Sequence, residues 1–235
     1  MTTTYGLYLD HGPKRRTTMV HVIDLMGCVA NGPTTHGVLE ATPGAVRGFL
    51  TFLAAHGDAV EPDAPFDVRI IEEITEGVWL GQGIAVFGPD RDPVKPAELD
   101  RLVERHGWIR EATLAAVADL SASDLDAAPE HGRPLGGILQ HVMGAEGSYL
   151  SSGLAANRRL NALSRSAENG EIDVREALAE GAELFAADLR AATPAQRKAV
   201  IQRGQSIGSV RRTLRRSLEH GWEHLQEIRT RLSEV

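Results

Sequence analysis

The hydrophobic pattern of this 235-residue chain changes its period at one point, and no other feature constrains the fold as strongly. Before residue 88, short segments alternate or run apolar as β-strands do. After residue 96, apolar residues recur at the 3.6-residue spacing of α-helices. The segment Gly88–Pro96 between them holds three prolines and four charged residues, a composition typical of linkers. Two domains are therefore predicted, at 1–88 and 97–235.

The first domain has the pattern of a small α+β unit. Apolar residues between Thr34 and His56 recur at helical spacing, and Pro43 inside this segment predicts a kink or a break, because proline lacks the N–H of the helical ladder. β-branched and aromatic runs predict strands at Tyr5–Leu9, Thr17–Ile23, Phe66–Ile71 and Gly83–Phe87. The expected fold is a small antiparallel sheet with one covering helix.

The second domain has the pattern of a helix bundle. Ser121–Asp124 is predicted to open a short helical piece by capping its N-terminus. Long helices are predicted at about 97–119, 134–152, 172–191 and 207–233. Four long helices with short connections favour a four-helix bundle, and the whole chain is therefore assigned to the α+β class.

Composition and charge exclude some classes of protein. The formal net charge of −7 disfavours a general nucleic-acid binder. A single cysteine, Cys28, excludes an intrachain disulfide and a multi-cysteine zinc site, and its place after Gly27 indicates a small buried filler rather than a nucleophile. No apolar run approaches the length of a membrane helix and no signal peptide is visible, so a cytoplasmic protein without membrane contact is expected.

Two histidines in the last predicted helix lie one turn apart. His220 and His224 share a face that is separate from the apolar stripe, so both imidazoles can reach one metal ion. The segment lacks a glutamate directly after the first histidine, so it is not the motif of zinc metalloproteases. The alternative interpretation is a solvent-exposed helix surface.

The second bundle helix carries His141 and Glu146 at the two flanks of its apolar stripe. A third nitrogen from His141 would complete a three-histidine site with open positions for water or substrate. Glu146 is a candidate catalytic residue that would orient a ligand or act as a general base. The alternative is an ion pair with an arginine, because burying an unpaired carboxylate is costly. The other six histidines, His106 among them, are expected in turns, on a strand or at helix ends, without a partner at ligand spacing.

Two segments of the bundle half resemble the DinB/YfiT-like family of metal-binding four-helix bundles. They are GRPLGGILQHVMGAEGSYL at 132–150 and SVRRTLRRSLEHGWEHLQEI at 209–228. The resemblance covers roughly residues 95–233 and implies one divalent metal, with zinc or nickel expected, held by His141, His220 and His224. It also implies a homodimer and a small-molecule substrate, with a low-molecular-weight thiol as one candidate.

A segment of the first half resembles a second family. MVHVIDLMGCVANGPTT at 19–35 is similar to the strand–turn–helix segment of HicB-like antitoxin domains, over about residues 4–56. This resemblance implies a small sheet with a covering helix, and pairing with another protein.

Four arginines, Arg211, Arg212, Arg215 and Arg216, lie early in the last helix, where cations oppose the helix dipole. Acidic groups of the protein, a partner or an anionic substrate would compensate for them.

Two functions follow from these patterns. The first is a metal-dependent enzyme, a thiol S-transferase or a hydrolase, that activates a thiol or a water molecule. The alternative is a non-enzymatic binding or regulatory protein, in which the HicB-like half pairs with a protein partner and the bundle dimerises.

Overall fold

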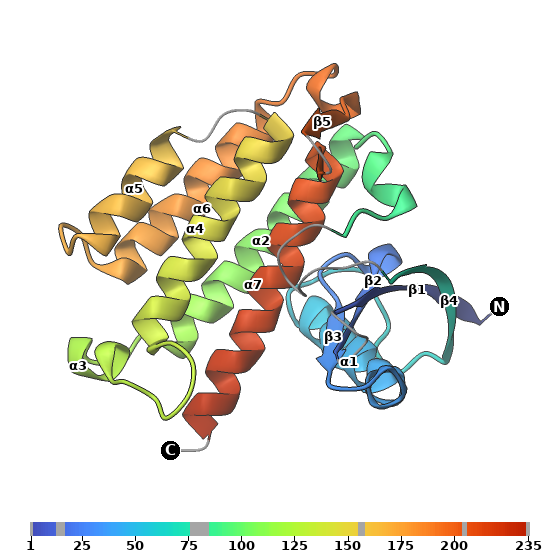
Figure 1. Cartoon of the computed structure of the whole chain (residues 1–235), viewed down its shortest axis with the longest axis horizontal. Helices are drawn as coiled ribbons and strands as arrows, with labels where there is room; N and C mark the ends of the chain where they lie inside the picture. The colour runs from blue at the N-terminus through green and yellow to red at the C-terminus, as the bar shows by residue number, and fades with distance from the viewer. Residues whose placement is uncertain (1, 13–16, 76–84, 155–157, 204–205, 234–235) are drawn as a thin grey trace. The chain divides into compact units, whose positions relative to one another are not determined.

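The structure, a computed structural model, describes residues 2–12, 17–75, 85–154, 158–203 and 206–233 (Figure 1). The chain divides into two compact units. The first comprises residues 1–92 with 202–207, and the second comprises residues 93–201 with 208–235. Both helices and strands are present, as the α+β assignment requires.

The first unit contains a four-stranded sheet in the order β3-β2-β1-β4. Its strands are β1 (Thr3–His11), β2 (Thr18–Val22), β3 (Val29–Gly32) and β4 (Phe66–Ile74). The β1–β2 and β2–β3 pairs are antiparallel, but β4 runs parallel to β1, so the prediction of an antiparallel sheet was wrong for this strand. The reason is the connection, because α1 (Thr35–Ala55) carries the chain from β3 back to the end where a parallel strand begins. Of the strand predicted at 83–87, residues 83 and 84 lie outside the described residues, and residues 85–87 form no strand.

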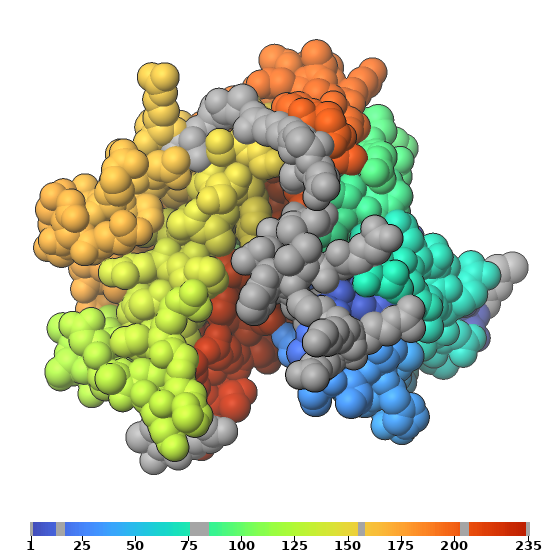
Figure 2. Space-filling model, in the orientation of Figure 1, coloured from blue at the N-terminus to red at the C-terminus, as the bar shows by residue number. Residues whose placement is uncertain are grey.

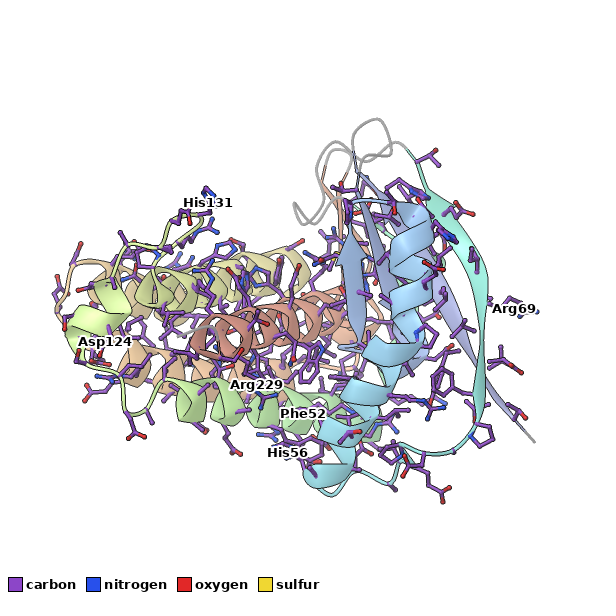
Figure 3. All side chains as sticks on the ribbon, turned by 90° about the horizontal axis from the view of Figure 1, so that it is seen from below. Phe52, His56, Arg69, Asp124, His131 and Arg229 are labelled. Atoms are coloured by element: carbon purple, nitrogen blue, oxygen red, sulfur yellow. The ribbon has the colours of Figure 1, made fainter. Side chains whose placement is uncertain are left out.

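Helix α1 passes through Pro43 without interruption, so the predicted break does not occur. Pro43 is exposed, so its ring and the missing N–H donor lie on the outer side of the helix. The hydroxyl of Thr42 donates to the Val38 carbonyl at 2.7 Å. At the other end of the helix, His56 packs against Phe52 with ring centroids 4.3 Å apart (Figure 3). Cys28 is buried, as expected.

The second unit is built around the four predicted long helices. They are α2 (Pro96–Ala116), α4 (Leu135–Leu154), α6 (Val174–Arg190) and α7 (Val210–Ser233). Both α2 and α4 pack against α6 and α7, so α2 and α4 face each other diagonally across the bundle. The predicted capping by Ser121 is confirmed at the start of α3 (Ala122–Asp126).

Several elements of the structure were not predicted. Helix α5 (Arg158–Glu168) packs on the outside of α4 and α6 (Figure 1). Strands β5 (Ile201–Arg203) and β6 (Ser206–Gly208) pair with each other ahead of α7. Short 3-10 turns lie at Ile23–Leu25, Gly88–Arg91 and Gln196–Lys198.

Helices α4 and α7 run antiparallel and approach closely near the C-terminus of α4. A Cβ atom at Gly153 would lie 2.3 Å from the Thr213 hydroxyl and 2.6 Å from the Ser209 carbonyl oxygen, so only glycine fits. The Thr213 hydroxyl donates to the carbonyl of Tyr149 at 2.8 Å. This contact fixes the axial register of α4 and α7, and in this register His141 lies opposite His220. Among the described residues, no helix combines the length and the apolar character that crossing a membrane requires.

Candidate metal centre

Three histidine side chains converge between α4 and α7. The Nε2 atom of His220 lies 3.1 Å from Nε2 of His141 and 3.1 Å from Nε2 of His224. The candidate ligand atoms of all three residues lie within 4.8 Å of one another. The structure therefore brings together the three histidines that the sequence singled out.

The helices position these rings by simple geometry. His220 and His224 are four residues apart, so they lie one above the other on the same face of α7. The antiparallel register described above supplies His141 from α4. Rings of the three residues meet edge to face, with centroids 4.5 to 5.2 Å apart. This arrangement gathers one nitrogen from each of the three rings within 4.8 Å of the others.

The surroundings favour the neutral form of the imidazoles. Burial lowers the pKa of His220 well below its ordinary value, and His224, His141, Arg216 and Arg110 lower it further. Burial, followed by the charge of Arg133, also lowers the pKa of His141. An imidazole must be unprotonated at its donor nitrogen to bind a metal, so these shifts suit a ligand.

His224 is held in place by a carboxylate that sequence reasoning missed. Its Nδ1 lies 2.7 Å from Oε2 of Glu227, which leaves Nε2 to face the other histidines. Arg231 pairs with the same carboxylate through Oε1 and donates to the Arg133 carbonyl at 2.6 Å. Metal-binding histidines commonly donate their second N–H to a carboxylate in this way. The signal was present in the sequence as the spacing of Glu227, three residues after His224 and four before Arg231.

The donor set fits a divalent transition metal. Two nitrogens bound to one zinc ion at its usual bond length are about 3.0 to 3.4 Å apart. Two of the three separations, at 3.1 Å, are close to this value, and the third pair of donor atoms lies within 4.8 Å. Three imidazole nitrogens leave at least one position for water or substrate. The Nδ1 atom of His220 is buried and has no hydrogen-bond partner among the described residues, so no second contact fixes the tautomer of this ring.

Glu146 faces a different part of the bundle. Its Oε1 accepts hydrogen bonds from Arg110 Nη2 at 2.5 Å and His106 Nε2 at 2.6 Å, both on α2. Burial raises the pKa of Glu146, but the charges of Arg110 and His106 and their hydrogen bonds lower it by more, so the net pKa lies below its ordinary value. Glu146 therefore forms a buried ion pair with an arginine, as the alternative interpretation expected. This pairing gives no reason to assign Glu146 the role of a general base.

His106 itself was misjudged by sequence reasoning. It was expected at a helix end, but it lies in the middle of α2, buried, with its ring stacked on Phe185 of α6 at 4.5 Å. Charged residues interrupt the apolar stripe of α2, so the sequence did not show that His106 lies on the buried face of this helix. Exposed loop positions were predicted correctly for other histidines, such as His131 (Figure 3).

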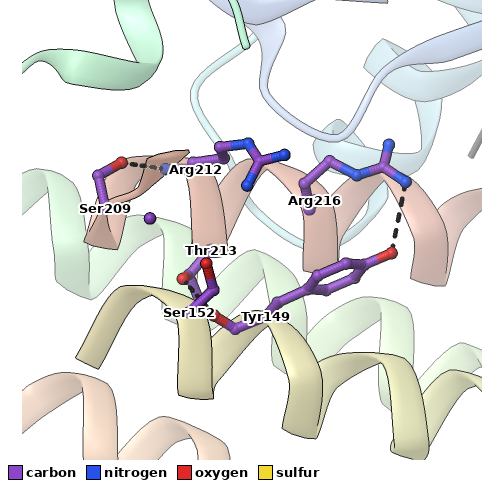
Figure 4. A pocket seen from close by; sticks show the side chains of 7 residues that line it. Tyr149, Ser152, Ser209, Arg212, Thr213 and Arg216 are labelled. Atoms are coloured by element: carbon purple, nitrogen blue, oxygen red, sulfur yellow. Dashed lines mark hydrogen bonds between the residues drawn. The ribbon is translucent and has the colours of Figure 1, made fainter. Parts of the chain in front are cut away.

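The arginines of α7 are compensated largely by acidic groups of the same unit. Arg211 donates to both carboxylate oxygens of Glu98, at 2.7 and 2.9 Å. Arg215 and Arg216 contact Oε2 of Glu219 at 2.9 and 3.3 Å. Arg216 also reaches the Tyr149 hydroxyl at 3.3 Å (Figure 4). The hollow that Figure 4 shows beside these residues measures about 10 Å³, room for about one water molecule and too small for an organic anion.

Comparison with known protein families, curated proteins and solved structures finds no match for this chain.

Proposed function

We propose that the second unit binds one divalent metal ion through the Nε2 atoms of His141, His220 and His224. The observation that carries this proposal is the convergence of three imidazole nitrogens from two helices, two of them only 3.1 Å from the third. Without a metal, Nε2 of His220 carries at most one hydrogen atom in the neutral ring, so it can donate to only one of its two histidine neighbours. The carboxylate of Glu227 supports the same proposal, because it orients His224 for coordination.

Zinc or nickel is the proposed metal. Imidazole ligands suit zinc, nickel, copper and iron, and geometry and availability decide among them. The resemblance of residues 132–150 and 209–228 to DinB/YfiT-like bundles supports the same ligand set. A bound metal of this kind lowers the pKa of a coordinated water or thiol and so supplies a nucleophile near neutral pH.

The residues of the chain give the site its other properties. His220 is nearly buried, so the donor nitrogen is shielded from bulk water. Glu227 and Arg231 fix the ring of His224. We infer that the unit is a metal-dependent enzyme of the thiol S-transferase or hydrolase type acting on a small molecule.

The test is metal binding to the whole chain, expressed without a histidine tag. Equilibrium dialysis against Zn²⁺ or Ni²⁺, followed by elemental analysis, should give one metal per chain. Replacing His141, His220 and His224 together by alanine should abolish this binding while the helical circular dichroism is kept. His131→Ala is the matched control, because His131 is exposed and lies in a loop. Equal metal content in the triple variant and the wild type would refute the proposal.

A second candidate function, self-association or protein binding through the first unit, is favoured by one observation. Strand β4 is at the edge of its sheet, and Ile70 and Ile71 are 42% and 46% exposed there. Exposed edge strands are ready to pair with another chain. If a second copy of the chain binds at this edge, sedimentation should show a dimer that Ile71→Lys converts to a monomer, while metal content stays unchanged.

A further inference from the structure

A groove of about 530 Å³ lies beside His141 in the second unit. A groove of this size suits a small molecule. It is lined mainly by one side of α4, with one residue from the turn before it and one from α5, and Figure 2 shows these two helices side by side at the surface. The lining residues are Arg133, Gly137, Gln140, His141, Gly144, Ala145, Ser148 and Glu168. One of the three candidate metal ligands is therefore also part of the wall of a groove.

The groove is open because α4 carries very small residues along it. A Cβ atom at Gly144 would have only the Ser164 hydroxyl within 4 Å, at 3.8 Å. A side chain at this position would thus occupy groove space without displacing the backbone. The absence of side chains at Gly137 and Gly144 costs helix stability, since glycine is a poor helix former.

Arg133 is placed at this groove by a specific set of contacts. Gly132 has a φ of +87°, and a Cβ atom there would lie 2.7 Å from Nη2 of Arg231. Nη1 of Arg231 donates to the Arg133 carbonyl at 2.6 Å. Arg231 also pairs with Glu227, the carboxylate that holds His224. The turn that carries Arg133 is thus tied through two side chains to a candidate metal ligand.

The positive charge of the Arg133 guanidinium can pair with an anionic ligand. Arg133 and the candidate metal ligand His141 line the same groove. Throughout the described part of the chain, no carboxylate oxygen lies within ion-pair distance of Arg133. Glu168, the acidic residue of the groove, accepts instead from the Ser164 hydroxyl at 3.5 Å.

We propose that the groove binds a small organic anion, with a carboxylate held by Arg133 and a second group at the open position of the three-histidine centre. A guanidinium pairs with a carboxylate through two parallel N–H donors, which gives orientation as well as affinity. This inference rests on the proposed metal centre and adds the chemical class of its substrate.

The experiment uses the full chain loaded with Co²⁺, whose visible spectrum reports ligands that enter its coordination sphere. Succinate, glutarate and adipate are titrated in parallel with the monocarboxylates of the same chain lengths, butyrate, valerate and hexanoate. At least one dicarboxylate should bind about tenfold more tightly than its monocarboxylate partner, because it alone reaches both the metal and Arg133. Arg133→Gln should reduce this preference to about twofold or less and leave monocarboxylate binding unchanged.

A second variant tests the groove itself. Gly144→Leu should fill the groove and weaken both classes of carboxylate by about tenfold or more, with Co²⁺ content unchanged. Gly48→Leu, on the exposed face of α1 with nothing near its added Cβ, is the matched control. A dicarboxylate preference that survives Arg133→Gln, or is absent from the wild type, overturns the groove proposal. Failure of the wild type to take up Co²⁺ at the histidines would instead overturn the metal centre.

Discussion

The side chain of Glu227 determines how well His224 can bind a metal. With its carboxylate 2.7 Å from Nδ1 of His224, the ring is held in the tautomer that offers Nε2 to a metal. Glu227→Gln keeps the size of the side chain but removes its charge, and we expect metal affinity to fall by about tenfold. Competition with a chromogenic chelator measures this change. Glu180→Gln, on the exposed face of α6, should leave the affinity unchanged.

Glu146 is expected to matter for folding. Glu146→Gln leaves the guanidinium of Arg110 buried without its counter-charge, and breaking such a pair costs about 3 kcal/mol of unfolding free energy. Urea denaturation measures the loss. Metal content should be retained under native conditions, and a variant that stays fully stable would contradict the assignment of Glu146 to a structural ion pair.

The same carboxylate predicts a pH dependence. Its pKa is lowered in the folded state, so its stabilising contribution is complete above the pKa of the unfolded chain, near 4.3, and is lost as pH falls through the lower folded value. The wild type should therefore lose stability below about pH 4 more steeply than Glu146→Gln. Parallel slopes for the two proteins in acid denaturation would contradict this prediction.

At the scale of elements, the contact between α4 and α7 decides whether the histidines meet. Gly153→Ala would place a methyl group 2.6 Å from the Ser209 carbonyl oxygen, so the helices must separate. We expect a loss of about 2 kcal/mol in unfolding free energy and weaker metal binding, because His141 moves away from His220. Gly144→Ala on the same helix is the control, since the atom nearest to the added Cβ is the Ser164 hydroxyl oxygen, 3.8 Å away, and alanine favours the helix. Equal metal affinity in the two variants would show that this contact does not set the site.

Elements with a strong hydrophobic periodicity could be predicted from the sequence. Elements whose form depends on contacts with other elements could not. The long bundle helices follow largely from apolar spacing, although charged residues interrupt the apolar stripe of α2. The direction of β4 depends on how α1 returns the chain across the sheet, which the strand's own residues do not encode. Helix α5 is rich in arginine and polar residues, so its buried side, around Leu160 and Ser164, was too narrow to recognise. Pro43 failed as a break because it lies on the exposed side of α1.

At the scale of the whole molecule, the candidate site also combines a part that the sequence predicts with a part that depends on tertiary contacts. His220 and His224 are related by local spacing, which the sequence displays. Their meeting with His141, and the pairing of Glu146 with His106, depend on the register between helices far apart in the chain. The resemblance to a known bundle family suggested the first of these contacts, but nothing comparable suggested the second. Arg133 could not be recognised either, because its position depends on Arg231, which lies 98 residues later in the chain.

A metal that joins α4 to α7 should change the dynamics of one unit of the chain. A ligand that binds only the folded state stabilises it, by about 2.7 kcal/mol at a hundredfold excess over Kd. The added stability should slow amide hydrogen exchange in α4 and α7, whose opening would break the coordination, because exchange reports local unfolding. The three proposed ligands all lie in the second unit, so exchange in β1, β2 and α1 should stay the same when Zn²⁺ is added. Protection that appears equally in both units, or persists in the triple histidine variant, would mean that the ion binds somewhere other than between these two helices.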